Sequence, residues 1–262
     1  MEAADSSALR DRALVSLEGR EVEGLVLHVE MGPVSAGGAR YFELFLEEPG
    51  KDQARLFLED QGKDRVPRPV LRGFYRVGRE PAWNWVEVLR INPKEALPSP
   101  GGLPRVGADE AAARIEEALL KALADLVPAG GHMMVEYETR PETERALALG
   151  VPPPATPLGS LLRRVGCGTG FKDWYFTEGW TEGPRKLQGY KALNEEHSRR
   201  RARTTALELL DLLSKPHDPR QEDLLGPARR RAIEALRDIQ AGDEELDRRI
   251  REAVAAELLP GT

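Results

Sequence analysis

The chain has 262 residues, of which 40% are hydrophobic and 31% charged, with a formal net charge of −6 and a single cysteine, Cys167. These values are typical of a folded globular protein, and the negative balance argues against one that binds nucleic acid over its whole surface. No apolar run approaches the roughly 18 residues of a membrane span, and the polar N-terminus is unlike a secretory signal. We therefore expect a cytoplasmic protein with no membrane contact and no internal disulfide.

The first part of the chain predicts a helix followed by strands. Residues 8–17 place leucine and alanine at four-residue steps, as one face of a helix does. Alternating apolar and polar side chains then predict strands in five segments: 21–31, 41–47, 54–59, 70–77 and 83–91. The last segment, WNWVEVLRI, shows the alternation most clearly.

Helices alternate with strands in the middle of the chain. A loop rich in proline and glycine, residues 92–107, precedes a predicted helix over 109–127 that carries an apolar stripe. Further predicted elements follow: a strand over 132–138, short helices over 142–149 and 158–165, and an aromatic strand over 171–177.

From residue 194 onward the pattern is helical. One helix runs to about residue 213, a second begins at Pro227 and ends at Gly242, and Asp243 caps a third. We predict an α+β domain over residues 1–215 and a helical hairpin over 216–262. Because so small a hairpin cannot bury both of its apolar stripes, they must cover the same chain or a second copy, so the protein is a monomer or a homodimer.

Residues 168–191 combine aromatic rings, charges and glycines more densely than any other segment. Glycine lets the backbone approach another group closely, so we interpret this stretch as the lining of a ligand site. Proton transfer needs a titratable group beside the ligand, which makes Asp173, Tyr175 and, on the preceding strand, Glu136 the catalytic candidates. The alternative is that these side chains are solvated on exposed sheet faces.

The same stretch holds the candidate ligand-binding residues: Trp180, Arg185, Lys186, Gln188 and Lys191. Arginine offers a planar fork and lysine a point charge to a phosphate or carboxylate. Residues 163–203 contain ten basic and five acidic side chains, a net charge of +5 within a chain of −6. This asymmetry favours a small anionic ligand, with nucleic acid as a less favoured partner. A charged surface loop and a solvated helix face, the latter for the run 199–203, are the alternatives.

Signals for metal binding and for a cysteine nucleophile are poor. The histidines His28, His132, His197 and His217 have no paired ligand spacing, so we expect no metal. Cys167 adjoins a predicted core strand, and we expect it to be buried.

The order of the predicted elements over about residues 20–180 resembles the GNAT acetyltransferase fold. This resemblance implies a mixed, mostly antiparallel sheet flanked by helices, to which the C-terminal helices are an extension. It also implies acetyl-CoA as cofactor, held by the loop before helix 109–127. The loop residues that would take this role are Gly102, Arg105 and Gly107. Pro104, Asp109 and Glu110 depart from the pattern, because they remove a backbone donor or add negative charge where the pyrophosphate would lie.

A second resemblance is carried by FKDWYFTEGWTEGPRKLQGYK, preceded by GVPPPATPLG. These runs resemble the most recognisable stretch of a family of uncharacterised archaeal and bacterial proteins, the domain of unknown function numbered eleven twenty-two. That family brings no established activity, so two functions stay open. One is an acyl-CoA-dependent N-acyltransferase with Glu136 or Asp173 as base. The other is a non-catalytic module that binds an anionic ligand or nucleic acid through residues 163–203.

Overall fold

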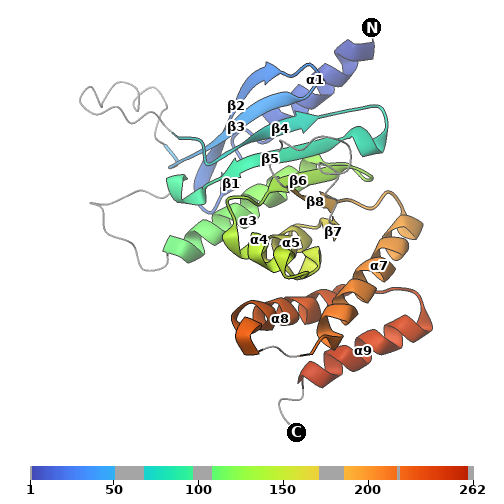
Figure 1. Cartoon of the computed structure of the whole chain (residues 1–262). Helices are drawn as coiled ribbons and strands as arrows, with labels where there is room; N and C mark the ends of the chain where they lie inside the picture. The colour runs from blue at the N-terminus through green and yellow to red at the C-terminus, as the bar shows by residue number, and fades with distance from the viewer. Residues whose placement is uncertain (1, 51–67, 97–107, 171–185, 217–218, 259–262) are drawn as a thin grey trace. The chain divides into compact units, whose positions relative to one another are not determined.

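The structure is a computed structural model of the whole chain, and it describes residues 2–50, 68–96, 108–170, 186–216 and 219–258. The chain divides into two compact units, Met1–Val127 and Pro128–Thr262 (Figure 1). Each unit contains both helices and strands, which confirms the predicted α+β class. The domain boundary predicted at residues 215 and 216 stays a prediction.

The N-terminal unit joins an antiparallel run of strands to two helices, α1 (Glu2–Val15) and α3 (Ala108–Leu126). Its strands pair in chain order: β1 (Glu21–Val22), β2 (Leu25–Val34), β3 (Arg40–Glu47), β4 (Leu71–Arg76) and β5 (Trp85–Ile91). Short 3-10 helices lie on either side of β5: η1 (Pro81–Trp83) and η2 (Pro93–Ala96). The strand predicted over 54–59 lies outside the described residues.

The core of this unit follows from the two-residue period of side chains along a strand and the 3.6-residue period along a helix. On β3, Phe42 and Leu44 are fully buried, and Gly73 of β4 pairs with Phe42. A Cβ at Gly73 would lie 2.2 Å from the carbonyl oxygen of Glu87, so only glycine permits this close approach of β4 to β5. The stripe predicted on α3 is buried as expected: Ile115, Leu119, Leu120 and Leu123.

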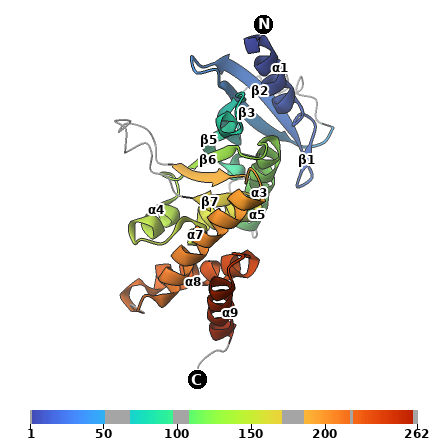
Figure 2. The ribbon, with the colours of Figure 1, turned by 90° about the vertical axis from the view of Figure 1, so that its right-hand side faces the viewer.

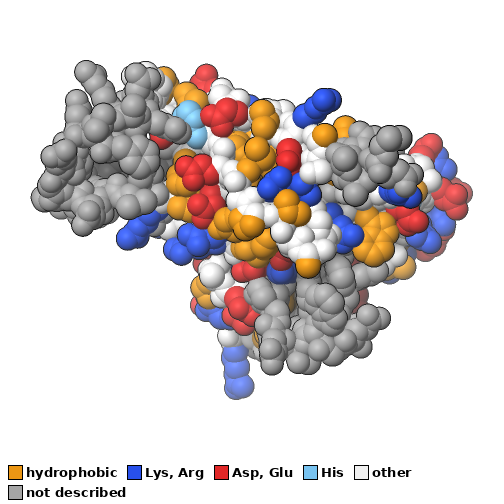
Figure 3. Space-filling view, turned by 90° about the horizontal axis from the view of Figure 1, so that it is seen from above, with side chains coloured by type: hydrophobic (Ala, Val, Ile, Leu, Met, Phe, Trp, Pro, Cys, Tyr) orange, Lys and Arg blue, Asp and Glu red, His pale blue; other side chains and the backbone are white. Residues whose placement is uncertain are grey.

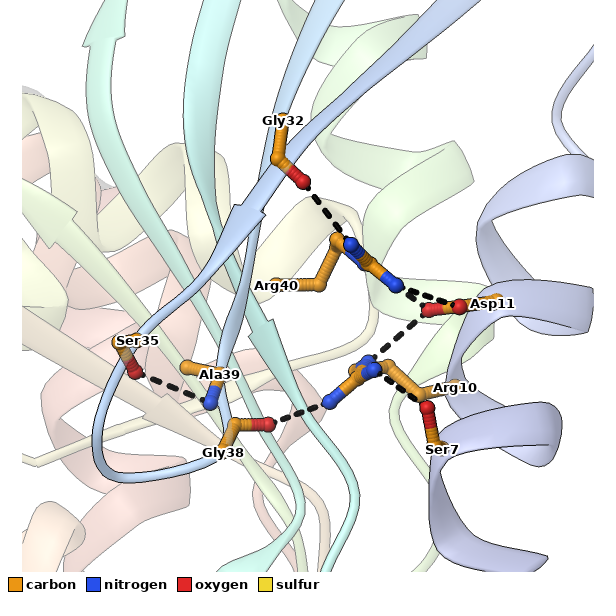
Figure 4. Close-up of polar contacts among 8 residues, drawn as sticks. All are labelled: Ser7, Arg10, Asp11, Gly32, Ser35, Gly38, Ala39 and Arg40. Carbon is orange, nitrogen blue, oxygen red and sulfur yellow. Dashed lines mark hydrogen bonds and ion pairs between the residues drawn. The ribbon is translucent and has the colours of Figure 1, made fainter. Parts of the chain in front are cut away.

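A polar clamp ties α1 to the β2–β3 hairpin (Figure 4). Arg10 donates from Nε to Asp11 (3.0 Å), from Nη1 to the Gly38 carbonyl (2.6 Å) and from Nη2 to Ser7 (2.8 Å). Arg40 donates to both carboxylate oxygens of Asp11 at 3.1 and 2.7 Å. Hydrogen bonds from Arg40 lower the pKa of Asp11, and the charge of Arg10 adds to this shift. The clamp is thus a closed network that holds α1 on the hairpin.

In the C-terminal unit, β8 (Lys186–Tyr190) pairs antiparallel with β6 (His132–Glu136) on one side and with β7 (Gly168–Gly170) on the other. Directly paired residues share a face of a sheet. One face therefore carries polar pairs, and the other carries the buried side chains of Met133, Val135 and Leu187. The sequence analysis predicted no strand over residues 186–190 and gave a charged surface loop as one alternative there. They form a strand instead, because Leu187 fills the core between polar neighbours.

The helices of this unit confirm most of the predicted pattern. They are α4 (Pro141–Ala148), η3 (Pro153–Ala155), α5 (Pro157–Arg164), α7 (Glu195–Ser214), η4 (Pro219–Gln221), α8 (Glu222–Asp238) and α9 (Glu244–Leu258). Asn194 and Asp243 cap α7 and α9 by accepting backbone hydrogen bonds at 2.9 and 3.0 Å. Helix α8 begins five residues before the predicted start at Pro227. Two acidic residues in its first turn favour that earlier start.

The apolar stripes of α8 and α9 pack within their own unit (Figure 2). Ala232 and Leu236 of α8 and Ile250 of α9 join one buried cluster with Leu209 of α7 and Ala155 of η3. The sequence left open whether these stripes pack on the same chain or on a second copy, and the structure shows them packed on the same chain.

Candidate functional site

A cavity of about 290 Å³ lies within the C-terminal unit. Among the described residues, its wall is made by η3, the end of α5, the first residue of β7, the last residue of β8, and facing parts of α7 and α8. The polar residues that line it are Arg163, Tyr190, Ser198, Arg201, Thr205 and Asp238. The remaining lining is small and mostly apolar: Pro154, Gly166, Gly168, Ala192, Ala202, Ala235 and Ile239.

Arg201 of α7 packs against Tyr190. Its guanidinium carbon lies 4.8 Å from the centroid of the Tyr190 ring, and the ring of His197 stacks on the same tyrosine at 6.0 Å. His197, Arg201 and Thr205 are spaced by four residues, so α7 presents all three on one side. The Nε of Arg201 is buried and has no hydrogen-bond partner among the described residues.

The titration of these groups reflects their packing. Burial raises the pKa of Tyr190, although Arg201 and a hydrogen bond with Thr205 oppose the shift. Burial also lowers the pKa of His197, and the positive charges of Arg201 and Arg200 act in the same direction. At neutral pH we therefore expect a neutral tyrosine and a neutral histidine beside a charged guanidinium.

Arg163 reaches the cavity from the last turn of α5. Its Nη1 forms an ion pair with Asp238 at the end of α8, and its Nη2 lies 4.0 Å from Glu234. Its Nε, like that of Arg201, is buried without a partner in the described part of the chain. Two arginines on different helices thus line the same cavity, and each has a buried Nε without a partner among the described residues.

Gly168 lets Tyr190 form its part of the wall. The two residues are paired across β7 and β8, and a Cβ at Gly168 would lie 2.9 Å from Cζ and 3.0 Å from the hydroxyl oxygen of Tyr190. Contacts that short are not tolerated, so any side chain here would push the ring away. The glycine is therefore needed for the observed shape of the cavity.

Four of the sequence-predicted site residues lie in the described part of the chain. Glu136 pairs with Lys186 across β6 and β8, and the Gln188 amide lies 2.6 Å from Nδ1 of His132. These side chains occupy the strand face that also bears Tyr190, although the described lining of the cavity does not include them. Lys191 follows β8, and its backbone N–H donates to Gly131 at 3.0 Å.

The other predicted site residues fall outside the described residues: Asp173, Tyr175, Trp180, Arg185, Gly102, Arg105 and Gly107. The sequence analysis did not single out Tyr190, Ser198, Thr205 or Asp238. The net charge of residues 163–203 was a signal for Arg163 and Arg201, and the four-residue spacing along α7 could have added Thr205. Nothing in the sequence connected Asp238 to them.

Two arginines of the basic run 199–203 form ion pairs or hydrogen bonds with other residues of the same unit. Arg199 forms an ion pair with Glu195, and Arg203 donates to the carbonyl oxygens of Ala241 and Gly242 at 3.0 Å each. On one face of the molecule, shown in Figure 3, acidic and basic side chains are interspersed with hydrophobic ones. These contacts support the interpretation of the run as a helix face with local partners.

Within the described ranges, no group of three or more histidine, cysteine, aspartate or glutamate side chains is placed to hold a metal ion. None of the helices in that part of the chain is both long enough and apolar enough to cross a membrane. Cys167 is 1% exposed, which confirms the prediction that it is buried.

Comparison with known proteins gives two similarities. Residues 54–216, which include Arg163, Tyr190 and Arg201, match a family described as "Protein of unknown function (DUF1122)". The chain is also similar to a crystal structure of a protein of unknown function from Aquifex aeolicus VF5. The two are 25% identical with a TM-score of 0.56, and the similarity covers 84% of this chain and 97% of the other. No curated protein matches the chain.

Proposed function

We propose that this chain, which belongs to the DUF1122 family of proteins of unknown function, binds a small anion in the cavity of its C-terminal unit. The family membership confirms the resemblance drawn from residues 171–191 and brings no activity with it. The observation that carries the proposal is that Arg163 and Arg201, from different helices, line one cavity and that each keeps a buried Nε without a partner among the described residues.

A buried guanidinium donor needs a hydrogen-bond acceptor. A buried donor without an acceptor costs about 1–3 kcal/mol, and more when the group is charged. An oxyanion supplies strong acceptors, and its hydrogen bonds to guanidinium are charge-assisted. The Tyr190 ring already orients Arg201, so little side-chain freedom would be lost on binding. Such a site pairs a positioned cation with a cavity in which water screens charge only weakly.

The acyl-CoA-dependent N-acyltransferase and the GNAT-like fold stay predictions. Most of the residues on which they depend, among them Asp173 and Gly102, lie outside the described residues. The one carboxylate in the described lining, Asp238, is paired with Arg163, so it is a poor general base. This supports a binding role over proton transfer at the cavity.

Nucleic acid binding through residues 163–203 also stays a prediction. The internal partners of Arg199 and Arg203 leave fewer cations for phosphates, and Glu195 and Glu196 lie beside them. A nucleic-acid complex would weaken steeply as salt is raised, with a slope that grows with each neutralised phosphate. We expect no such complex at physiological salt.

The experiment compares Arg201→Gln with Arg200→Gln. Both changes remove one positive charge from the same turn of α7, but Arg200 is exposed and does not line the cavity. Acetate, butyrate, sulfate and phosphate are titrated by calorimetry, and their effect on thermal stability is measured. An anion present at about 100 times its Kd stabilises the folded chain by about 2.7 kcal/mol.

We expect at least one anion to stabilise the natural chain and Arg200→Gln, and to lose its effect on Arg201→Gln. An equal effect on both variants would place the anion elsewhere. If every anion is without effect on the natural chain, the proposal is wrong.

A further inference from the structure

The cavity has an apolar side as well as a charged one. Ala202 of α7 and Ala235 and Ile239 at the end of α8 line it, together with Pro154 of η3. Ala235 is fully buried, and none of these four side chains can hydrogen-bond to a ligand. An inorganic oxyanion would leave this apolar surface against water or empty space, which forfeits the gain from covering it.

The two arginines at the cavity differ in whether they already form an ion pair with a carboxylate. Asp238 already pairs with Arg163, and Glu234 lies 4.0 Å from the same guanidinium. Arg201 instead packs on an uncharged aromatic ring. Glu208 also interacts with the charge of Arg201, so a ligand meets at most about one uncompensated positive charge, and a single negative charge balances it better than a phosphate dianion does.

The volume sets an upper limit on size. Pockets that enclose drug-sized ligands hold roughly 300–1,000 Å³, and this cavity has about 290 Å³. The ligand is therefore a small molecule with a charged end and an apolar body.

We infer, on the basis of the anion site proposed above, that the ligand is a small aliphatic monocarboxylate. Its carboxylate pairs with the guanidinium groups of Arg201 and Arg163, and its hydrocarbon part packs against Ala202, Ala235 and Ile239. The guanidinium groups select the anion, and the alanines and isoleucine select the length and shape of the chain.

The test is a series of straight-chain carboxylates, from acetate to decanoate, titrated into the full chain by calorimetry. Each methylene that enters the apolar part of the cavity should tighten binding about fourfold, until the cavity is full and the gain stops. The primary alcohols of the same lengths are the control for non-specific hydrophobic binding, and they should bind more weakly at every length. Phosphate and sulfate complete the panel.

Ala202→Leu tests the apolar wall separately from the charged end. Ala202 is half-buried and lines the cavity, so a larger side chain there should shorten the preferred carboxylate while acetate binding stays within about twofold. The matched control is Ala256→Leu on the exposed face of α9, which should leave the whole series unchanged.

The outcomes separate this inference from the proposal on which it rests. Binding that tightens with length, and that Ala202→Leu shortens, supports both. If phosphate or sulfate binds more tightly than every carboxylate, or if length has no effect, the inference is wrong and the anion site stands. If neither carboxylates nor inorganic anions bind, both are wrong.

Discussion

Two regions of this molecule bury arginine, and they differ in what the arginine side chains leave unused. In the N-terminal clamp, every N–H-bearing nitrogen of Arg10 donates to a partner, and Arg40 adds two bonds to Asp11 and one to the Gly32 carbonyl at 2.9 Å (Figure 4). At the C-terminal cavity, Arg163 and Arg201 each keep a buried Nε without a partner among the described residues.

The difference separates two uses of the same side chain. A guanidinium whose donors are all met by its own unit contributes to stability, and replacing it leaves its partners unpaired. A guanidinium with an unpaired donor lowers the stability of the folded chain when no ligand is bound. A ligand that accepts a hydrogen bond from this donor reduces that cost. Accounting for each donor thus distinguishes the clamp from the candidate site, although both contain two arginines.

The largest expected effect is on the clamp. Asp11→Ala removes the acceptor shared by Arg10 and Arg40, and Arg10 is only 5% exposed, so we expect the free energy of unfolding to fall by about 3 kcal/mol. Urea denaturation measures the change. Arg114→Ala, which breaks an exposed ion pair with Glu23, is the control and should cost under about 1 kcal/mol. Equal losses in the two variants would mean that the clamp is no stronger than a surface pair.

Gly168→Ala tests the cavity wall. The added methyl group collides with the Tyr190 ring, so we expect a loss of about 2 kcal/mol in unfolding free energy and at least tenfold weaker anion binding. Gly37→Ala is the control, because the nearest atom to its Cβ would be 3.9 Å away. A Gly168→Ala chain with unchanged stability and affinity would show that the ring moves aside freely.

A direct comparison of the two regions uses the same substitution in each. Arg40→Gln should cost about 2–3 kcal/mol, because Asp11 loses two hydrogen bonds from a charged donor. Arg201→Gln should change the free energy of unfolding by less than about 1 kcal/mol without ligand, because its Nε has no partner to lose among the described residues. If Arg201→Gln is the more destabilising, Arg201 is structural and the distinction between the regions fails.

The smallest expected effect is on the pH dependence of the clamp. The folded-state pKa of Asp11 is lowered, so its contribution is present above the unfolded pKa of about 3.9 and is lost as pH falls through the folded value. The difference in urea midpoint between the natural chain and Asp11→Asn should therefore be full at pH 6 and shrink below pH 4. A difference that stays constant to pH 2.5 would contradict this role for the carboxylate.

The sequence predicted most of the described elements because their periodicities were strong. The stripe of α3, the start of α7 near residue 194 and the alternation along β5 each agree with the structure. The strand over residues 186–190 was not predicted, because a five-residue strand with polar side chains on one face carries little apolar signal. Helix α8 begins before the predicted start, because Pro227 was interpreted as a first-turn residue and lies inside the helix instead.

The site was predictable only as a region. The charge of residues 163–203 pointed to an anion, and it included both arginines of the cavity. The pairing of Gly168 with Tyr190, and of Arg163 with Asp238, depends on strand register and on helix packing over long sequence distances. Local composition does not encode such juxtapositions, so the cavity itself could not be read from the sequence.

The long sequence separation between Arg163 and Asp238 determines when the cavity can be completed during synthesis. The two residues are 75 positions apart, and ribosomes add about 5–20 residues per second, so about 4–15 s separate their translation. During that interval β7 and α5 exist without the helix that closes the cavity. The nascent chain therefore completes its binding site only after residue 238 has been translated, and the complete site is available to free ligand only from that point on.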